Sequence, residues 1–144
     1  MLDNYSSLNH SRWECKYHVV FIPKYRSKKL YNDMRVYLVE VFKDLARMKE
    51  SEILEGHLAR DHVHMLISIP PKYAVCNVIG FLKGKSAIRI AREYMGKKNL
   101  REQNFWARGY LVTTVGKDEA SIRDYIEHQE KHDRRTDQLK LKMY

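Results

Sequence analysis

The chain has 144 residues and a formal net charge of +9, and 44% of its residues are hydrophobic. This size suits one domain with its own core, so no second catalytic domain is expected. The excess of Lys and Arg favours a polyanionic partner, with nucleic acid as the first candidate. The two cysteines, Cys15 and Cys76, are too few for a disulfide framework, and we expect both to be small buried residues.

We expect neither a signal peptide nor a membrane span in this sequence. The longest apolar runs fall far short of the roughly 20 residues that cross a bilayer, and the N-terminus lacks the apolar stretch of a signal peptide. We therefore expect a cytoplasmic protein with no membrane partner. We expect one domain over residues 1–144, with a core over 13–130 and a basic tail over 131–144.

Strand and helix patterns alternate along the chain. They predict strands over 13–22, 53–59, 62–69 and 105–115, and helices over 32–49, 75–96 and 118–129. The order βαββαβ followed by one more helix is typical of a ferredoxin-like α+β fold, an antiparallel sheet with two helices on one face. The last helix has few apolar residues, so we expect it to be loosely held and free to cover the other face of the sheet.

The strand over 62–69 carries the first candidate site. Its alternation places Val63 and Met65 on a core face and His62 and His64 together on the opposite face. Two imidazoles on one side of a rigid strand can bind one metal ion. The alternative is a half-exposed pair without an ion. We expect the neighbouring Asp61 to point to the other face.

The last predicted helix supplies the second candidate group. Tyr125 and Gln129 are four residues apart and therefore neighbours on one helix face. Gln129 offers an amide oxygen as a third metal ligand, for which His128 is a rival, and Tyr125 offers a phenol that can attack a phosphodiester. The alternative for Tyr125 is simple packing at the edge of the core.

Two basic clusters, over residues 24–31 and 83–101, predict contacts with phosphates. The cluster over 24–31 is interleaved with tyrosines, as in proteins that bind single-stranded nucleic acids. Each cluster is also compatible with an ordinary solvated surface. The candidate DNA-binding residues are Lys24, Arg26, Lys83, Lys85, Arg89 and Arg92.

Several segments together resemble one known family. They are YHVV at 17–20, PKYR at 23–26, DHVHML at 61–66, FWARGY at 105–110, and Tyr125 with Gln129. This set resembles the small single-tyrosine HUH transposases of the IS-two-hundred-like insertion sequences, the TnpA type, over nearly the whole chain. The resemblance implies a DNA transposase that nicks and rejoins single-stranded DNA at the ends of an insertion sequence through a covalent 5′-phosphotyrosine.

The resemblance also implies residue roles and partners. By position, Tyr125 matches the nucleophile, and His62, His64 and Gln129 match the metal ligands. The family's enzymes are homodimers that recognise DNA hairpins at the element ends, with active sites shared between subunits. Mixed nitrogen and oxygen ligands favour Mg²⁺ or Mn²⁺.

Other functions remain open on these residues. One is a domesticated tyrosine transposase associated with repetitive palindromes, which would share the chemistry but serve a host locus. Another is a ferredoxin-like nucleic-acid-binding module without catalysis. A zinc hydrolase is disfavoured, because no Asp or Glu is obviously placed as a base and third ligand.

Overall fold

The computed structural model describes residues 6–8, 11–24, 32–94, 105–116, 120, 123–128 and 141–142. In chain order its named elements are β1 (Ser6–Leu8), β2 (Ser11–Trp13), β3 (Lys16–Phe21), α1 (Asn32–Met48), β4 (Glu52–Leu58), β5 (Val63–Ser68), α2 (Val75–Tyr94), β6 (Leu111–Val115) and β7 (Leu141–Lys142). β1 and β2 form a small hairpin, and the remaining named strands form one sheet in the order β6-β3-β5-β4-β7. All neighbouring strands are antiparallel, which confirms the predicted α+β fold.

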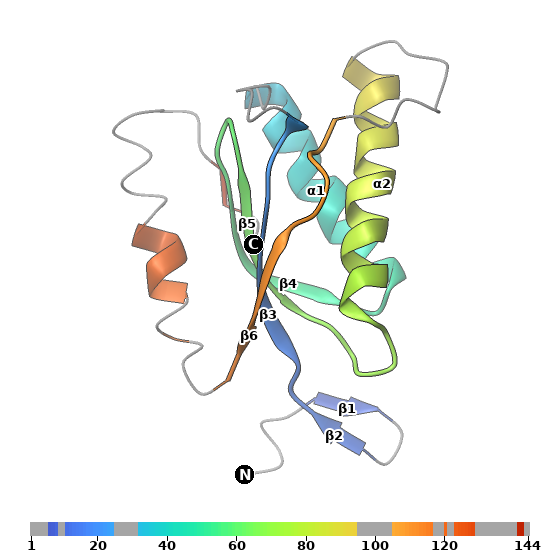
Figure 1. Ribbon diagram of the computed structural model, residues 1–144, viewed down its shortest axis with the longest axis vertical. Coiled ribbons are helices and arrows are strands. Elements are labelled where there is room, and N and C mark those ends of the chain that lie inside the picture. The colour runs from blue at the N-terminus through green and yellow to red at the C-terminus, as the bar shows by residue number, and fades with distance from the viewer. Residues whose placement is uncertain are drawn as a thin grey trace.

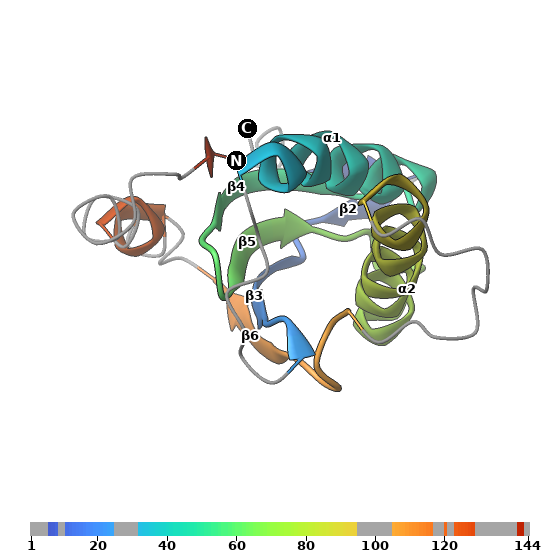
Figure 2. The same ribbon diagram turned by 90° about the horizontal axis from the view of Figure 1, so that it is seen from above.

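The four predicted strands are present as β3, β4, β5 and β6. β3 and β5 lie in the centre of the sheet, with β6 beside β3 and β4 beside β5. α1 and α2 pack against each other on one face of this sheet (Figure 1, Figure 2). The edge strand β7 and the hairpin β1–β2 were not predicted from sequence.

β5 shows how both faces of the sheet are covered. Val63, Met65 and Ile67 lie in the main core with the apolar faces of α1 and α2, as the alternation predicted. Leu66 lies on the other face, in a small separate cluster with Val115 and Ile126. All of β5 is buried, so neither face of its backbone is open to water.

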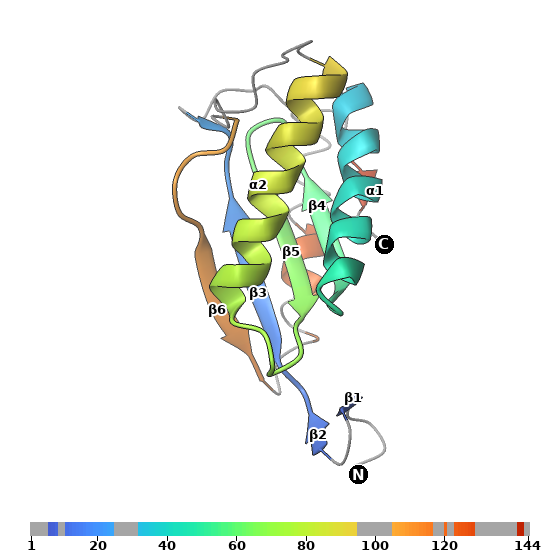
Figure 3. The same cartoon turned by 90° about the vertical axis from the view of Figure 1, so that its right-hand side faces the viewer.

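Residues 123–128, here called the tyrosine helix, lie on the sheet face opposite α1 and α2 (Figure 1, Figure 3). Ile126 is fully buried there, whereas Asp124, Tyr125 and His128 are exposed. In the described part of this helix, a single apolar side chain therefore anchors it to the sheet, in keeping with the weak apolar stripe in the sequence.

The predicted strand over 105–115 is wrong in its first half, because β6 begins only at Leu111. Gly109 has φ = 76°, a left-handed backbone conformation that interrupts an extended strand. The ammonium group of Lys83 donates hydrogen bonds to the carbonyl oxygens of Ala107 at 2.8 Å and of Gly109 at 2.6 Å. A helix side chain, and not a neighbouring strand, therefore satisfies these carbonyl groups.

The prediction for the cysteines is wrong at one position. Cys76 is exposed, because it lies in the first turn of α2, before the first buried residue of that helix, Val78. Cys15 is half-buried. Within the described residues, none of the helices has the length and apolar character needed to cross a membrane.

Candidate active site

The predicted histidine pair lies on the sheet face covered by the tyrosine helix. His64 stands in the centre of the sheet, opposite Val20 of β3 and His57 of β4 in the strand register. His62 precedes β5, and its ring centroid is 4.7 Å from that of His64. Both imidazoles therefore lie together on one face, as predicted, although the strand itself begins only at Val63.

Two further histidines join this pair, and the sequence reasoning missed both. His18 of β3 has its Nε2 atom 3.3 Å from Nδ1 of His64, and the ring centroid of His57 is 5.8 Å from that of His62. A signal was available for His18, because Tyr17, Val19 and Phe21 alternate with it on the opposite side of β3. Strand alternation alone does not say which strands are neighbours, so the sequence left this cluster unassembled.

The histidine cluster keeps His64 neutral. Burial, followed by the effects of His62, His18 and His57, lowers the pKa of His64 to about 3. Burial also lowers the pKa of His18. Neutral imidazole is the form that binds metals, because one ring nitrogen keeps its lone pair.

Asp61 does not point away from the pair, so that expectation is wrong. Its Oδ1 atom lies 2.8 Å from Nδ1 of His62. The chain turns between β4 and β5 at this point, which releases Asp61 from the strict alternation of a strand. A carboxylate at this distance accepts a hydrogen bond from Nδ1–H of a neutral His62, which leaves the lone pair of the ring on Nε2.

Tyr125 lies over the same cluster. Its ring centroid is 6.3 Å from that of His18 and 6.5 Å from that of His64. The residue is 49% exposed, so the phenol is open to a substrate while its ring faces the histidines. All of these groups belong to one chain, which brings the candidate nucleophile and the histidine cluster together within a single subunit.

The remaining predicted ligand, Gln129, lies outside the described residues, whereas its rival His128 is exposed. Within the described part of the chain, no three His, Cys, Asp or Glu side chains are arranged to hold a metal ion. His62 and His64 nevertheless fit part of such a site, because their rings lie close together on one face. His64 is also neutral, as a metal ligand must be. A further ligand of another type is needed, and an amide oxygen suits Mg²⁺ or Mn²⁺.

The predicted DNA-binding residues do not gather at this site. Lys85, Arg89 and Arg92 follow one another on α2 at helical spacing, and α2 lies on the sheet face opposite the histidines (Figure 2). Lys83 of the same helix uses its ammonium group to hold the carbonyls of residues 107 and 109. Lys24 lies three residues beyond the end of β3, where its backbone N–H donates a hydrogen bond to the carbonyl of residue 105. Arg26 lies outside the described residues.

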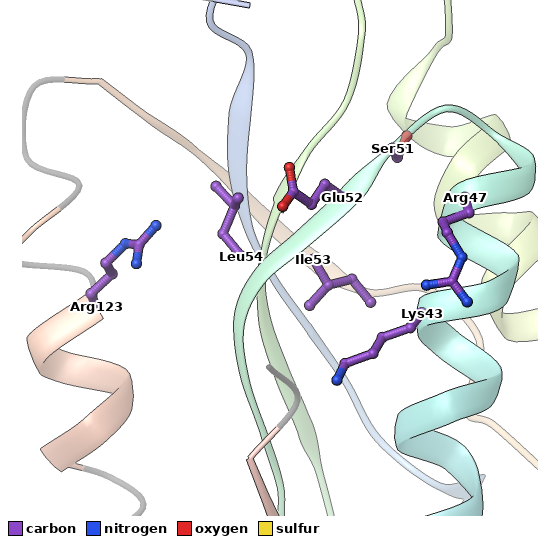
Figure 4. Close-up of a pocket in the computed structure, with 7 residues that line it drawn as sticks. All are labelled: Lys43, Arg47, Ser51, Glu52, Ile53, Leu54 and Arg123. Atoms are coloured by element: carbon purple, nitrogen blue, oxygen red, sulfur yellow. The ribbon is translucent and has the colours of Figure 1, made fainter. Parts of the chain in front are cut away.

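A separate cavity of about 670 Å³ lies beside β4, between α1 and the tyrosine helix (Figure 4). Lys43 and Arg47 reach toward it from α1, and Arg123 reaches toward it from the tyrosine helix. Glu52 and the apolar Ile53 and Leu54 complete its β4 side. Among the residues that the structure describes, none of those predicted as site residues lines this cavity.

Comparison with known proteins identifies the family. The family model described as "Transposase IS200 like" matches residues 11–129. The chain is 44% identical over 136 residues to the transposase for insertion sequence element IS200 of Salmonella typhimurium, covering 94% of this chain and 90% of that protein. It is 32% identical over 124 residues to the ISDra2 transposase TnpA of Deinococcus radiodurans, covering 85% of this chain and 87% of that protein.

Solved structures agree on the fold. A Deinococcus radiodurans protein whose crystal structure is assigned as a transposase superposes with a TM-score of 0.69 at 27% identity, covering 86% of this chain and 97% of that one. A REP-associated tyrosine transposase bound to a REP hairpin superposes with a TM-score of 0.63 at 17% identity, covering 88% of this chain and 74% of that one. The chain belongs to the IS200-like transposase family. Its enzymatic class is therefore that of a DNA-processing transposase.

Proposed function

We propose that this transposase nicks and rejoins single-stranded DNA at the ends of its element through a covalent 5′-phosphotyrosine on Tyr125. The position of Tyr125 supports the proposal most directly, since its ring lies beside those of His18 and His64. A phenol that is 49% exposed is within reach of a DNA strand. One of these two rings, the neutral His64, can serve together with His62 as an imidazole ligand of a divalent cation.

In the proposed reaction, Oη of Tyr125 attacks the phosphorus of a phosphodiester, and the bond from phosphorus to the 3′ oxygen of the preceding nucleotide breaks. The phenolic proton passes to solvent, and the leaving 3′ oxygen takes up a proton. One phosphate ester replaces another, so a DNA 3′ hydroxyl can later attack the phosphotyrosine and restore a phosphodiester. No ATP is needed.

His62, His64 and Gln129 are the proposed ligands of the Mg²⁺ or Mn²⁺ ion. When bound, such an ion polarises the phosphate and offsets negative charge that develops in the transition state. The contribution of the chain itself is to hold two imidazoles on a rigid strand and to present Tyr125 above them. Alignment of the nucleophile with the phosphate is then set by the docking of the tyrosine helix.

We further propose that the DNA partner is a hairpin at the element end. The solved REP-associated relative is described as bound to a REP hairpin. In this chain, the proposed contacts are Lys24, Arg26 and the α2 residues Lys85, Arg89 and Arg92, whereas the ammonium group of Lys83 is held by the carbonyls of Ala107 and Gly109. Because α2 lies on the face opposite Tyr125 (Figure 2), a hairpin that contacts both must pass round the sheet edge or span two subunits.

The proposed assembly is a homodimer with active sites shared between subunits. Ile126 holds the tyrosine helix on the sheet of its own chain, so sharing requires this helix to move to the partner. Moving the tyrosine helix to the partner has a small energetic cost, because in its described part this helix is held by one buried apolar side chain.

The nucleophile is tested by trapping the covalent product. Labelled hairpin DNA is incubated with the protein and Mn²⁺ or Mg²⁺, and a denaturing gel resolves protein joined to DNA. We expect an adduct for the wild type and for the matched control Tyr37→Phe on α1, and none for Tyr125→Phe. An adduct with Tyr125→Phe, or none with the wild type, contradicts the proposal. DNA binding that persists without any adduct and ignores a chelator supports a binding module instead.

Mixing two inactive variants tests the shared sites. Tyr125→Phe and His62→Ala are combined and allowed to exchange subunits. If Tyr125 of one subunit works together with the histidines of the other subunit, the mixed dimer contains one intact active site and regains cleavage. Sites built within one subunit give no recovery, and a monomeric protein at working concentration excludes the dimer.

A further inference from the structure

His18 lies outside the predicted ligand set but makes a polar contact with one of its members, His64. Its Nε2 atom is 3.3 Å from Nδ1 of His64, and the ring centroids are 5.4 Å apart. The two residues are 46 positions apart in the chain but lie diagonally on adjacent strands, since His18 pairs with Leu66 and His64 pairs with Val20. Each is only 9% exposed, so water competes little for this contact.

The contact allows two arrangements of protons. Either Nδ1–H of His64 donates to Nε2 of His18, or Nε2–H of His18 donates to Nδ1 of His64. In the second arrangement a neutral His64 carries its remaining proton on Nε2, and no nitrogen is left with a lone pair for a metal. His64 can therefore bind a metal while keeping this contact only in the first arrangement.

The same condition holds independently for His62. Its Nδ1 lies 2.8 Å from Oδ1 of Asp61, and an ionised carboxylate only accepts hydrogen bonds. Neutral His62 is thus held with its proton on Nδ1 and its lone pair on Nε2. Asp61 and His18 make matching contacts with the two histidines, each on the Nδ1 side.

We propose that His18 is a positioning residue of the active site, whose Nε2 accepts a hydrogen bond from Nδ1–H of His64 and so fixes His64 with its Nε2 lone pair directed to the metal. The inference rests on the proposed metal site. Hydrogen bonds of this kind orient metal-binding histidines, and their loss typically weakens metal affinity roughly 10- to 100-fold. His18 also lies edge-on to the Tyr125 ring, at 6.3 Å and an interplanar angle of 83°, so it links the ligand and the nucleophile.

A buried imidazole at this position is not explained by packing alone. The next β3 residue on this face, Val20, is aliphatic. Burying a polar ring has a desolvation cost that a hydrogen bond must offset. The hydrogen bond with His64 offsets that desolvation cost and accounts for the presence of an imidazole at His18.

The test uses full-length, DNA-free protein and two variants of His18. His18→Leu removes the acceptor and keeps the bulk, whereas His18→Gln keeps an acceptor oxygen near the position of Nε2. Mn²⁺ affinity is measured by electron paramagnetic resonance, with His62→Ala as the variant that defines the site. We expect His18→Leu to weaken Mn²⁺ binding roughly 10- to 100-fold and His18→Gln to restore affinity close to the wild type. Unchanged affinity in His18→Leu, or equal losses in both variants, overturns the proposal.

A second readout does not depend on the metal. Long-range ¹H–¹⁵N NMR spectra of the metal-free wild type report which nitrogen of each histidine carries the proton. We expect His64 protonated on Nδ1, His18 unprotonated on Nε2, and loss of this single tautomer of His64 in His18→Leu. The reverse tautomers overturn the proposal even if a variant fails to fold. If Mn²⁺ binding is unaffected by His62→Ala, the proposed metal site fails separately, while the NMR result still decides the role of His18.

Discussion

Ile126 of the tyrosine helix packs against Leu66 of β5, and both side chains are 0% exposed. This contact holds Tyr125 over the histidines, because the residues on either side of Ile126 are exposed or half-buried. In its described part, the helix is thus positioned by the side chain of Ile126. A substitution of Ile126 therefore affects the active site without disturbing the packing of the main core.

Ile126→Ala is expected to release the tyrosine helix. Deleting a buried aliphatic side chain costs about 2–5 kcal/mol, which here falls on local docking and not on the main core. Amide hydrogen exchange over residues 123–128 should accelerate at least roughly tenfold, with the exchange of β5 little changed. Ile126→Val is the matched control and should keep most of the protection. Uniform loss of protection across the sheet would contradict a local anchor.

Lys83→Met is expected to lower stability more than DNA affinity. The substitution leaves the carbonyls of Ala107 and Gly109 without their donor, at a cost of about 1–3 kcal/mol in the free energy of unfolding. Lys85→Met, which alters an exposed neighbour on α2, should change stability by less than about 0.5 kcal/mol and reduce hairpin binding.

Urea unfolding and fluorescence anisotropy with labelled hairpin DNA separate these two effects. The reverse pattern would place Lys83 among the DNA contacts after all. It would also mean that the segment 105–110 does not depend on the ammonium group for its conformation.

Acidification is expected to destabilise the metal-free protein through His64. Its pKa is about 3 in the folded chain against 6.5 ordinarily, so below pH 6.5 the unfolded chain binds a proton that the folded chain does not. The free energy of unfolding therefore falls as the pH falls from 6.5 toward 3, and this group accounts for about 2 kcal/mol between about pH 7.5 and about pH 5. Urea midpoints in chelator-treated buffer measure it. His64→Gln should show a shallower pH dependence, and identical slopes would exclude His64 as the cause.

Gly109→Ala tests the break that separates the 105–110 segment from β6. At φ = 76° any side chain is strained, although a Cβ atom there meets no atom within 4 Å. We expect a loss of about 1–2 kcal/mol from backbone strain alone. Gly116→Ala also adds a Cβ atom in open space but at no positive φ, so it should cost less than about 0.5 kcal/mol. Thermal unfolding compares the two variants, and equal effects would mean that the conformation of Gly109 is not what sets its cost.

The sequence by itself determined the parts of this transposase that depend on local periodicity. Alternation along 62–69 placed His62 and His64 on one face, and helical spacing located α1 and α2. The motifs that matched a known family likewise lie within short segments. These features follow from backbone geometry over a few residues, which is written directly in residue order.

Only the tertiary structure decided which of these faces meet. Strand register brought His18 to His64, and the turn before β5 brought Asp61 to His62. The packing of Ile126 brought Tyr125 close to His18 and His64. The layering of the fold also separates α2, with its cations, from the tyrosine helix, because the two helices lie on opposite faces of the sheet (Figure 2). Contacts between distant segments depend on strand order and layer stacking, which the pattern within any one segment does not encode.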